Sequence, residues 1–442
     1  MDVIQRKKML EKIIDSVIDE ALNGSQPELI RDIDSCFEYI LTKCYPEGVP
    51  PEKEKEIIKK LVKAKLEPDK KSKKKEPIIN IIEEACEHCV GGSKPCQNAC
   101  VVDAIKFDEN GKHTIDEEKC VYCGLCANAC RSGAIVERSE FLQVINMIRR
   151  RDNNPVYAIL APSFVGQFGD KVLPEQVKAG LKRLGFTDVF EVALAADVIT
   201  IQEAREFIDR MGRGENFMIT SCCCPAFIKL VEKHRPKVAH LVSESVSPMI
   251  AMGRFIKARE KNARVVFIGP CIAKKNEAKL PDLNDAVDCV LTFYELSRLF
   301  NVAKIKLVEM DKLPILDAAH DGRTFAHTGG VTQAITRSIK SMRPDLEVKA
   351  VKGNGLKQCN ELLKEIEEKG LEANFMEGMG CPGGCVAGPA TLVPVKVSTP
   401  KVAEFADKSP FIESISNPRA LNLFERYGNM TQLLSKKKKV RV

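Results

Sequence analysis

The sequence predicts an α/β protein that is preceded by a small cysteine-rich α+β domain and a helical N-terminal segment. Three observations predict this fold class. From about residue 155 onward, short β-branched runs alternate with helical patterns, which favours parallel strands covered by helices. Cysteines are dense between residues 78 and 138. Apolar residues such as Ile4, Ile13 and Val17 recur at helical spacing near the start of the chain.

These patterns divide the 442 residues into three predicted parts. Residues 1–75 are a helical segment that ends in a lysine-rich linker, residues 76–140 the cysteine-rich domain, and residues 141–442 the α/β domain. Helices of the first part are expected at about 4–17, 27–42 and 51–64. Strands of the α/β domain are expected at 156–160, 217–220, 265–268 and 289–291.

Composition and charge narrow the function classes. No stretch of 18 or more uncharged apolar residues is present, so a membrane partner is not expected. Residues 1–14 carry charges of both signs, which argues against a secretory signal and predicts a cytoplasmic protein. The net charge of +7 comes largely from lysines at 70–75 and 436–439, a pattern typical of solvated linkers or tails. No nucleic-acid-binding motif accompanies them, so nucleic acid is not an expected partner.

The 18 cysteines are the most informative residues. In a cytoplasmic protein, clustered cysteines bind metal more often than they form disulfides. One group follows the C-x2-C-x2-C-x3-C spacing of bacterial ferredoxins: Cys120, Cys123, Cys126 and Cys130. Three thiolates of one tight loop can cap three irons of a 4Fe–4S cubane, while the fourth ligand comes from further away.

A looser motif precedes this one, with Cys86, Cys89, Cys96 and Cys100 in C-x2-C-x6-C-x3-C spacing. Each motif is followed by Ala-Ile after three residues, and this internal symmetry favours a ferredoxin-like pair of clusters. We expect the last cysteine of each motif to bind the cluster of the other. One 4Fe–4S cluster would then lie on Cys86, Cys89, Cys96 and Cys130, and a second on Cys100, Cys120, Cys123 and Cys126. A zinc site or inert thiols are the alternative.

Three further cysteine motifs lie far apart in the chain. They are TSCCCP at 220–225, GPCIAKKNE at 269–277 and EGMGCPGGC at 377–385. The first two directly follow predicted strands, where ligands of open α/β sheets bind. The glycines of the third let the backbone approach a bulky inorganic group. Together the motifs predict four thiolates that converge on one buried metal cluster.

These motifs resemble the signatures of the iron-only (FeFe) hydrogenases, which have the forms TSCCP, PCxxKxxE and ExMxCxGGC. The resemblance covers about residues 80–420 and includes the ferredoxin-like segment. It implies a two-lobed α/β catalytic domain with a six-iron cofactor, the H-cluster, between the lobes. Cys224, Cys271, Cys381 and Cys385 would hold its 4Fe–4S cubane. The Cys385 sulfur would bridge to a two-iron subsite that carries carbon monoxide, cyanide and a dithiolate bridge and is installed by hydrogenase maturases.

The resemblance also implies roles for residues around that subsite. Cys223 would pass protons between the dithiolate and the protein. Lys274 would donate to a cyanide, since charge-assisted donors hold anionic acceptors best. Ala161, Pro162 and Ser163 resemble the segment whose backbone and hydroxyl contact the other cyanide, and Met379 would pack against the subsite.

A proton route completes the implied site. Glu203 and Glu206 lie three residues apart and share one helix face. Their register, and that of Ser243, matches the two glutamates and the serine of the family's proton relay. Carboxylates and a thiol suit this task because burial can move their pKa values toward neutrality. A solvated helix face and a surface serine are the alternative.

The sequence departs from the family pattern in several places. Three consecutive cysteines replace the usual two; we take Cys224 as the ligand because it precedes Pro225, and a shifted ligand is the alternative. Cys222 is then a spare thiol. Gly269, Met249 and Phe227 replace a methionine, a glutamine and a tryptophan that are common in the family. Residues that contact the ligands tune the redox potential and reactivity of a metal centre. These changes are therefore expected to alter the catalytic bias and the rate.

The expected function is reversible interconversion of H2 with protons and electrons, with electrons relayed by the two 4Fe–4S clusters to or from ferredoxin or a similar carrier. Two alternatives stay open. One is a hydrogenase-like iron–sulfur assembly or scaffold protein that lacks the two-iron subsite. The other is a slow hydrogen sensor. Cys223, Lys274 and Met379 argue against the scaffold, because only the two-iron unit needs them.

Overall fold

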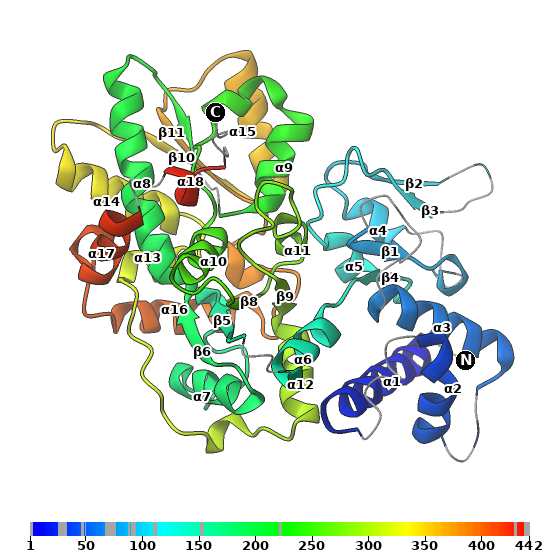
Figure 1. Ribbon diagram of the computed structural model, residues 1–442. Coiled ribbons are helices and arrows are strands. Elements are labelled where there is room, and N and C mark those ends of the chain that lie inside the picture. Colours follow the sequence, from blue (N-terminus) through cyan, green and yellow to red (C-terminus); the bar gives the residue numbers. More distant parts are fainter. Residues whose placement is uncertain are drawn as a thin grey trace. The chain divides into compact units, whose positions relative to one another are not determined.

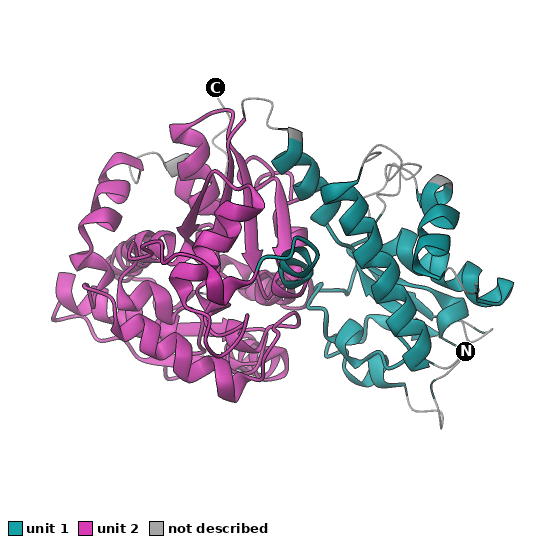
Figure 2. Cartoon of the chain, turned by 90° about the horizontal axis from the view of Figure 1, so that it is seen from below, with its two compact units in different colours: residues 1–151, 295–305 teal, residues 152–294, 306–442 magenta. Residues whose placement is uncertain are grey.

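The computed structural model describes twelve ranges or positions of the chain (Figure 1): residues 3–24, 33–45, 48, 50–66, 77–86, 89, 94–107, 109, 113–150, 154–220, 223–427 and 431–436. The chain forms two compact units (Figure 2). Unit 1 is Met1–Arg151 with Glu295–Ile305, and unit 2 is Asp152–Tyr294 with Lys306–Val442. The helical segment and the cysteine-rich domain therefore share one unit, and the boundaries at residues 75 and 140 stay a prediction. Among the described residues, no helix has both the length and the apolar character needed to span a membrane.

The N-terminal part of unit 1 consists of three helices, α1 (Val3–Asn23), α2 (Ile33–Cys44) and α3 (Glu52–Leu66). They form because apolar residues recur at helical spacing and give each helix one buried stripe, as Ile14, Val17 and Ile18 do on α1. The three helices pack on one another, and α1 also packs on α6 (Phe141–Arg150). Residues 27–32 of the second predicted helix lie outside the described residues.

The cysteine-rich part of unit 1 contains two antiparallel strand pairs. One pair is β1 (Ile79–Ile81) with β4 (Ile135–Glu137), and the other is β2 (Ile105–Phe107) with β3 (His113–Ile115). Short helices lie between the strands: η2 (Glu83–Ala85), α4 (Pro95–Asn98) and α5 (Leu125–Ala129). This is the small α+β domain that the sequence predicts.

Unit 2 contains a four-stranded parallel sheet in the order β6-β5-β8-β9. Its strands are β5 (Val156–Leu160), β6 (Asp188–Glu191), β8 (Arg264–Gly269) and β9 (Cys289–Thr292). The predicted strands at 156–160, 265–268 and 289–291 are confirmed. All four residues of β9 are buried, as expected for a parallel strand covered on both faces.

A second parallel sheet of unit 2 has the order β10-β11-β7, with β10 (Ala350–Asn354), β11 (Phe375–Met379) and β7 (Met218–Ile219). The strand predicted at 217–220 is shorter, because β7 pairs with β11 at only two positions. The core beside this sheet includes Phe207 and Phe375, whose rings meet edge to face with centroids 5.6 Å apart. The two parallel sheets correspond to the two predicted lobes.

Helices and turns of unit 2 surround the two sheets (Figure 1). The α-helices are α7 (Pro174–Leu184), α8 (Val192–Gly212), α9 (Pro225–His234), α10 (Pro248–Arg259), α11 (Ala273–Glu277), α13 (His320–Thr324), α14 (Gly330–Met342), α15 (Leu356–Glu368), α16 (Val395–Asp407), α17 (Pro418–Tyr427) and α18 (Thr431–Leu434). The 3-10 turns are η4 (Pro162–Phe164), η5 (Pro236–Leu241), η6 (Leu307–Glu309), η7 (Cys385–Ala387) and η8 (Ser414–Ser416). The helix α12 (Phe293–Val302) follows β9. Its residues from Glu295 onward belong to unit 1.

Buried polar contacts fix α8 in unit 2. Asp197 accepts hydrogen bonds from the backbone of Ala319 and Gly322 at 2.7 and 3.0 Å and from side chains of Ser414 and Asn417 at 2.7 and 3.0 Å. Because a buried carboxylate needs such donors, the aspartate holds α13 and η8 against α8. These contacts give Asp197 a structural role in unit 2.

Candidate metal centre

The cysteines of unit 1 lie in two groups. Burial, followed by the charges of Cys89, Cys130 and Cys96, raises the pKa of the Cys86 thiol to about 12. The pKa of Cys96 is likewise raised by burial, with Cys130 and Cys89 among the neighbours that raise it further. Thiols influence one another in this way only at short range, so the four cysteines are neighbours. Among the described residues, no set of three or more His, Cys, Asp or Glu side chains is arranged closely enough to hold a single metal ion.

The second group contains the four remaining cysteines of the two motifs. Burial, with Cys120 and Cys100 as neighbouring thiols, raises the pKa of Cys123 to about 12. The pKa of Cys126 is also raised by burial, and then by Cys123, Cys120 and Cys100. The last cysteine of each motif thus lies with the first three of the other. This grouping is the one that the crossed ligand assignment requires.

Backbone donors face sulfur atoms of the second group, and a histidine ring lies beside a sulfur atom of the first. The backbone N–H groups of Ala104 and Tyr122 donate to Sγ of Cys100 and Cys120, at 3.2 and 3.4 Å. The ring Nε2 of His113 lies 3.7 Å from Sγ of Cys86. Such donors favour the thiolate form that iron requires, so the residues present fit two iron–sulfur clusters.

The three catalytic-domain motifs follow strands of both sheets in unit 2. Cys224 follows β7 and caps α9, Cys271 follows β8 and precedes α11, and Cys381 and Cys385 lie on the loop after β11. Since ligands bind beyond the carboxyl ends of parallel strands, the fold carries all three motifs to the expected edge.

The structure brings three of the four predicted cubane ligands together. Burial and the neighbouring Cys224 thiol raise the pKa of Cys271 to about 11. Burial, with Cys224 and Cys271 as neighbours, raises that of Cys385 to about 12. The backbone N–H of Gly380 donates to Sγ of Cys224 at 3.3 Å. Cys381 is half-buried on the same loop, and its carbonyl accepts from the N–H of Gly384 at 2.9 Å.

Two glycines allow the third motif to pack closely. A Cβ on Gly384, whose φ is +96°, would lie 2.6 Å from the carbonyl oxygen of Ala326. A Cβ on Gly378 would lie 2.2 Å from the ring of Phe227. Side chains at these positions are therefore excluded by contact with other parts of the protein. The predicted approach of this backbone to an inorganic group stays a prediction.

Cys223 and Lys274 lie beside these thiols. Burial, followed by Cys385 and Cys224, raises the pKa of Cys223 well above its usual value, while the Lys274 ammonium opposes this shift. Lys274 is buried, and its Nζ lies 2.6 Å from Oε2 of Glu277, which is also buried. Burial lowers the pKa of Lys274, but the charges of Glu277, Cys271 and Cys223 outweigh it and raise the value. A cation is thus held among the thiols.

The other predicted cofactor contacts are also buried. Ser163 is fully buried, and its Oγ has no hydrogen-bond partner among the residues that the structure describes. Because buried hydroxyls are nearly always satisfied, this hydroxyl fits a donor to a group bound at the site. Ala161 and Met379 are buried as well, and Pro162 begins η4 between Ala161 and Ser163. These residues fit the predicted cofactor.

Gly269 stands beside an aromatic ring. A Cβ at this position would lie 2.6 Å from the Phe267 ring and 3.1 Å from Cβ of Ala161. Phe267 is itself buried. The ring therefore fills space that the common methionine of the family would need at this position.

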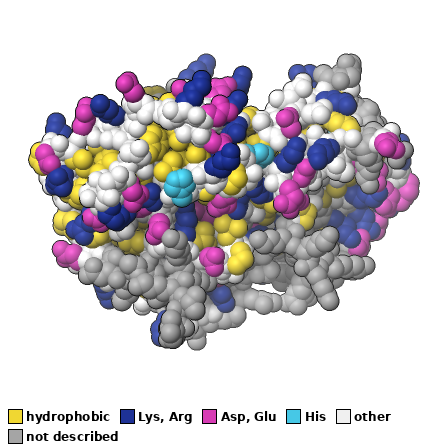
Figure 3. Space-filling model, turned by 90° about the horizontal axis from the view of Figure 1, so that it is seen from above, with side chains coloured by type: hydrophobic (Ala, Val, Ile, Leu, Met, Phe, Trp, Pro, Cys, Tyr) yellow, Lys and Arg dark blue, Asp and Glu magenta, His cyan; other side chains and the backbone are white. Residues whose placement is uncertain are grey.

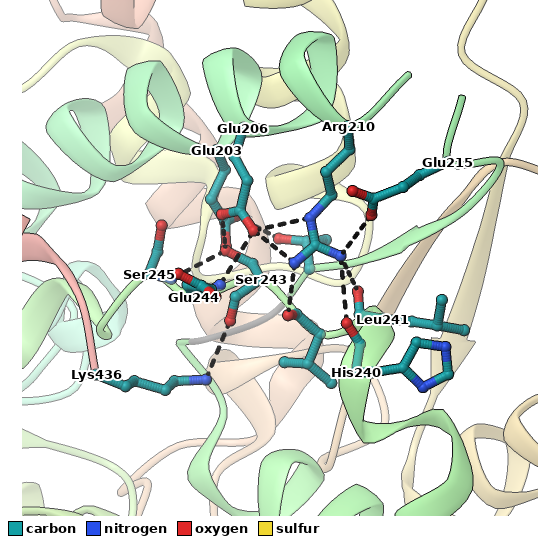
Figure 4. Close-up of polar contacts among 12 residues, drawn as sticks. Glu203, Glu206, Arg210, Glu215, His240, Leu241, Ser243, Glu244, Ser245 and Lys436 are labelled. Atoms are coloured by element: carbon teal, nitrogen blue, oxygen red, sulfur yellow. Dashed lines mark hydrogen bonds and ion pairs between the residues drawn. The ribbon is translucent and has the colours of Figure 1, made fainter. Parts of the chain in front are cut away.

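The predicted proton relay lies along α8 (Figure 4). Glu203 is fully buried and accepts a hydrogen bond from Oγ1 of Thr220, three residues before Cys223. Oγ of Ser243 donates to Oε2 of Glu206 at 2.7 Å. Glu206 and Glu244 both line a cavity of about 640 Å³ that is open to solvent. The interpretation of these glutamates as a solvated helix face is wrong for Glu203, which has no exposed surface.

Several residues of the site escaped the sequence reasoning. Arg210 binds Oε1 of Glu206 through Nε and Nη2, at 3.0 and 2.8 Å; the i,i+4 spacing of the pair on α8 was the available signal. Glu377 accepts from the N–H groups of Gly329 and Thr332 at 2.7 and 2.8 Å and so holds the start of α14. No signal in the sequence indicates that contact. Cys222 lies outside the described residues.

Comparison with known proteins places this arrangement in a family. Residues 154–389 match the family described as "Iron only hydrogenase large subunit, C-terminal domain", and residues 113–136 match a "4Fe-4S binding domain". The NADP-reducing hydrogenase subunit HndD of Solidesulfovibrio fructosivorans is 29% identical over 389 residues, which cover 74% of this chain and 65% of that protein. The chain thus spans about two thirds of the length of this relative.

Some other similar proteins are not named as hydrogenases. A probable cytosolic Fe–S cluster assembly factor of Drosophila melanogaster is 25% identical, over 68% of this chain and 78% of that protein. Among solved structures, a variant of the FeFe-hydrogenase HydA1 from Chlamydomonas reinhardtii has a TM-score of 0.58 and 21% identity, and the likeness covers 67% of this chain and 98% of that one. That likeness shows the fold of the catalytic domain. Since the matched segment 154–389 spans more than half of the 442 residues, the chain belongs to the iron-only hydrogenase family.

Proposed function

We propose that this protein is an FeFe-hydrogenase that interconverts H2 with protons and electrons. One observation carries the proposal: the thiols of Cys224, Cys271 and Cys385 are neighbours of Cys223 and of the Lys274 ammonium. The buried hydroxyl of Ser163, which has no hydrogen-bond partner among the described residues, supports it. A cubane alone needs four thiolates. A buried proton carrier, a buried cation and a free hydroxyl are additional groups that suit a larger cofactor with anionic ligands.

The residues that would hold the H-cluster are those that the family resemblance implies. Cys224, Cys271, Cys381 and Cys385 would bind the cubane, and the Cys385 sulfur would bridge to the two-iron subsite. Ser163 and Lys274 would donate to its cyanides, with Ala161, Pro162 and Met379 packed around it. When bound, this cofactor supplies the redox chemistry and the site at which the H–H bond forms or breaks.

The chain itself would carry the protons. Sγ of Cys223 would hold the proton nearest the cofactor. Glu203, Ser243 and Glu206 would form the route between this thiol and the cavity beside Glu206. The contacts of Thr220 with Glu203 and of Ser243 with Glu206 orient the two carboxylates. Carboxylates and hydroxyls in hydrogen-bond reach are suited to such transfers.

The two cysteine groups of unit 1 would each hold a 4Fe–4S cluster and pass electrons. Cys86, Cys89, Cys96 and Cys130 would bind one cluster, and Cys100, Cys120, Cys123 and Cys126 the other. The partners of this cytoplasmic protein would be ferredoxin or a similar carrier, together with the maturases that install the two-iron subsite.

The proposal is tested by H2 production from a reduced artificial electron donor, after anaerobic maturation beside a known hydrogenase. We expect turnover for the native chain and none for Cys385→Ser, because that variant loses the bridging thiolate. A native chain without turnover, in a batch whose control enzyme is active, would contradict the proposal.

An iron–sulfur assembly function is the second candidate, and the similarity to the Drosophila melanogaster assembly factor favours it. It would leave Cys223, Lys274 and Ser163 without a task at the metal centre. The slow sensor differs from the enzyme only in rate, so the same turnover measurement separates these two.

A further inference from the structure

The segment Thr431–Lys436 pairs with the backbone that carries the relay serine. The N–H of Val246 donates to the carbonyl of Leu434 at 2.8 Å, and the N–H of Lys436 donates to the carbonyl of Glu244 at 3.0 Å. Between these bonds, Ser245 and Ser435 form an antiparallel bridge. Residues 434–436, at the end of α18, therefore pair with residues 244–246 through an isolated bridge, directly after Ser243.

Two cations strengthen this docking. Nζ of Lys436 donates to the carbonyl of Ser243 itself, at 3.4 Å (Figure 4). Nη1 of Arg254, a buried residue of α10, donates to the carbonyls of Leu433 and Ser435 at 3.3 and 3.2 Å. The side chain of Leu434 is only 2% exposed. Charge-assisted bonds and a buried apolar anchor thus hold the segment in one position.

The opposite side of the serine loop is held by α8. The guanidinium of Arg210 donates to the carbonyls of His240, Leu241 and Val242, at 3.4, 3.2 and 3.0 Å. Oε1 of Glu206 accepts from the N–H of Glu244 at 3.1 Å. The loop is consequently fixed from two directions, and the Ser243 hydroxyl, 2.7 Å from Glu206, lies between them.

The same segment forms part of the wall of the cavity at the outer end of the relay. Leu434 and Ser435 line this cavity together with Glu206, Arg210 and Glu244. The segment therefore touches both the backbone of the relay serine and the space from which protons reach Glu206.

We propose that residues Thr431–Lys436 are a positioning element of the proton relay, which holds Ser243 in hydrogen-bond contact with Glu206. The inference rests on the proposed function. Without the segment, residues 244–246 lose their pairing partner and Ser243 loses its fixed distance to the carboxylate. A displacement of about 1 Å in a transfer group lowers rates by up to about a hundredfold, so the docked segment governs proton supply and leaves the metal centre unchanged.

The test compares two truncations of the matured protein. The chain that ends at Met430 lacks the segment, while the control that ends at Lys436 keeps it. We expect the shorter chain to lose about tenfold or more in turnover. Its turnover in D2O relative to H2O should fall further, because proton transfer becomes rate-limiting. Infrared bands of carbonyl and cyanide and the iron–sulfur signals should match those of the control.

If the chain that ends at Met430 is insoluble, two point variants test the same inference. Leu434→Ala removes the buried anchor, and Leu316→Ala, at a leucine that is 47% exposed, is the matched control. Amide hydrogen exchange at Val246 reports undocking and should speed up in Leu434→Ala alone. Unchanged turnover and isotope effect in the undocked variants would overturn the inference, as would a loss of turnover without faster exchange. Missing carbonyl and cyanide bands in the full chain would instead overturn the proposed function.

Discussion

In the proposed function, Cys223 is the residue on which the proton chemistry would depend. It lies beside Cys385 and Cys224 in the catalytic domain, and Thr220, three residues earlier, binds the buried carboxylate of Glu203. A thiol in this place can act as a proton carrier and does not need to bind iron. Its neighbours hold the cubane in the proposed ligand set.

Replacing this thiol gives the first prediction. Cys223→Ala should keep full iron content and lose about 10² to 10⁴-fold in H2 turnover, the range typical of acid–base groups. The measurement is H2 production together with iron analysis. Cys289→Ala, at another buried cysteine on β9, is the control and should keep its turnover. A Cys223→Ala protein as active as this control would refute the proton-carrier assignment.

The buried ion pair of Arg323 and Glu191 is a second residue-scale feature. The guanidinium binds both carboxylate oxygens at 2.9 and 2.8 Å, and both side chains are almost fully buried. Burial raises the pKa of Glu191, and the arginine opposes that shift. Removing the arginine leaves a buried carboxylate without its cation.

Arg323→Ala should therefore destabilise the protein by about 3–5 kcal/mol. Arg419, whose side chain is 56% exposed and pairs with Asp317, is the matched control. Arg419→Ala should cost about 1 kcal/mol or less, because exposed pairs contribute little. Denaturant midpoints measure both changes. Equal midpoints for the two variants would show that Glu191 does not depend on its partner.

At the scale of elements, β11 and α9 pack closely at the third cysteine motif. Gly378 on β11 faces the ring of Phe227 on α9, so that a methyl group has no space between them. The contact links the strand that leads to Cys381 and Cys385 with the helix that begins after Cys224.

Gly378→Ala should cost about 1–3 kcal/mol through overpacking and should lower the iron content of the catalytic domain. The double variant Gly378→Ala with Phe227→Leu should recover part of both losses, because the smaller side chain leaves room for the methyl group. Gly212→Ala on α8 has no atom within 4 Å of the new methyl group and serves as the control. Thermal midpoints and iron analysis measure the effects; an unchanged Gly378→Ala protein would contradict the packing argument.

The elements differed in how far the sequence could predict them. The strand at 156–160 is predicted at both ends because its apolar run is continuous, and four of its five residues are buried. The second sheet was mostly missed: β10 has an exposed lysine and asparagine and gives little apolar signal. Cysteine spacing predicted the two groups of unit 1, because the two motifs end in the same C-x3-C spacing. The contacts of Arg210 with Leu241 and of Lys436 with Ser243 join residues 31 and 193 positions apart, and no local pattern encodes such pairs.

At the scale of the molecule, unit 1 joins the N-terminal helices to the cysteine-rich domain. The N–H of Ser139 donates to the carbonyl of Lys65 at 2.7 Å, and Nζ of Lys65 lies 2.7 Å from Glu137 on β4. Arg6 on α1 donates to the carbonyl of Ala85, next to Cys86, at 3.4 Å. The helices thus support the strand and the loop on which the first cysteine group depends.

Deleting residues 1–75 should consequently reduce the iron bound by unit 1, while the catalytic domain keeps its cofactor and its turnover with an artificial donor. Iron analysis and the electron paramagnetic resonance of reduced clusters measure the loss against the full chain. A deletion variant with complete cluster content would show that the helices are dispensable for the cysteine-rich domain. Loss of soluble protein would show that they are essential to its core.

Lysine and arginine side chains are interspersed with aspartate and glutamate on the face drawn in Figure 3, as the modest net charge of +7 suggests. Mixed charges of this kind do not create the single-sign field that steers polyanions.

The most direct test of the proposed two-iron cofactor is an infrared spectrum of the anaerobically matured protein, recorded beside a known hydrogenase matured in the same batch. We predict bands of metal-bound carbonyl and cyanide, because in the proposed site Cys385, Lys274 and Ser163 would provide the contacts that such a cofactor needs. If these bands are absent while the control shows them and the 4Fe–4S clusters are present, the hydrogenase assignment is contradicted and the assembly function takes its place.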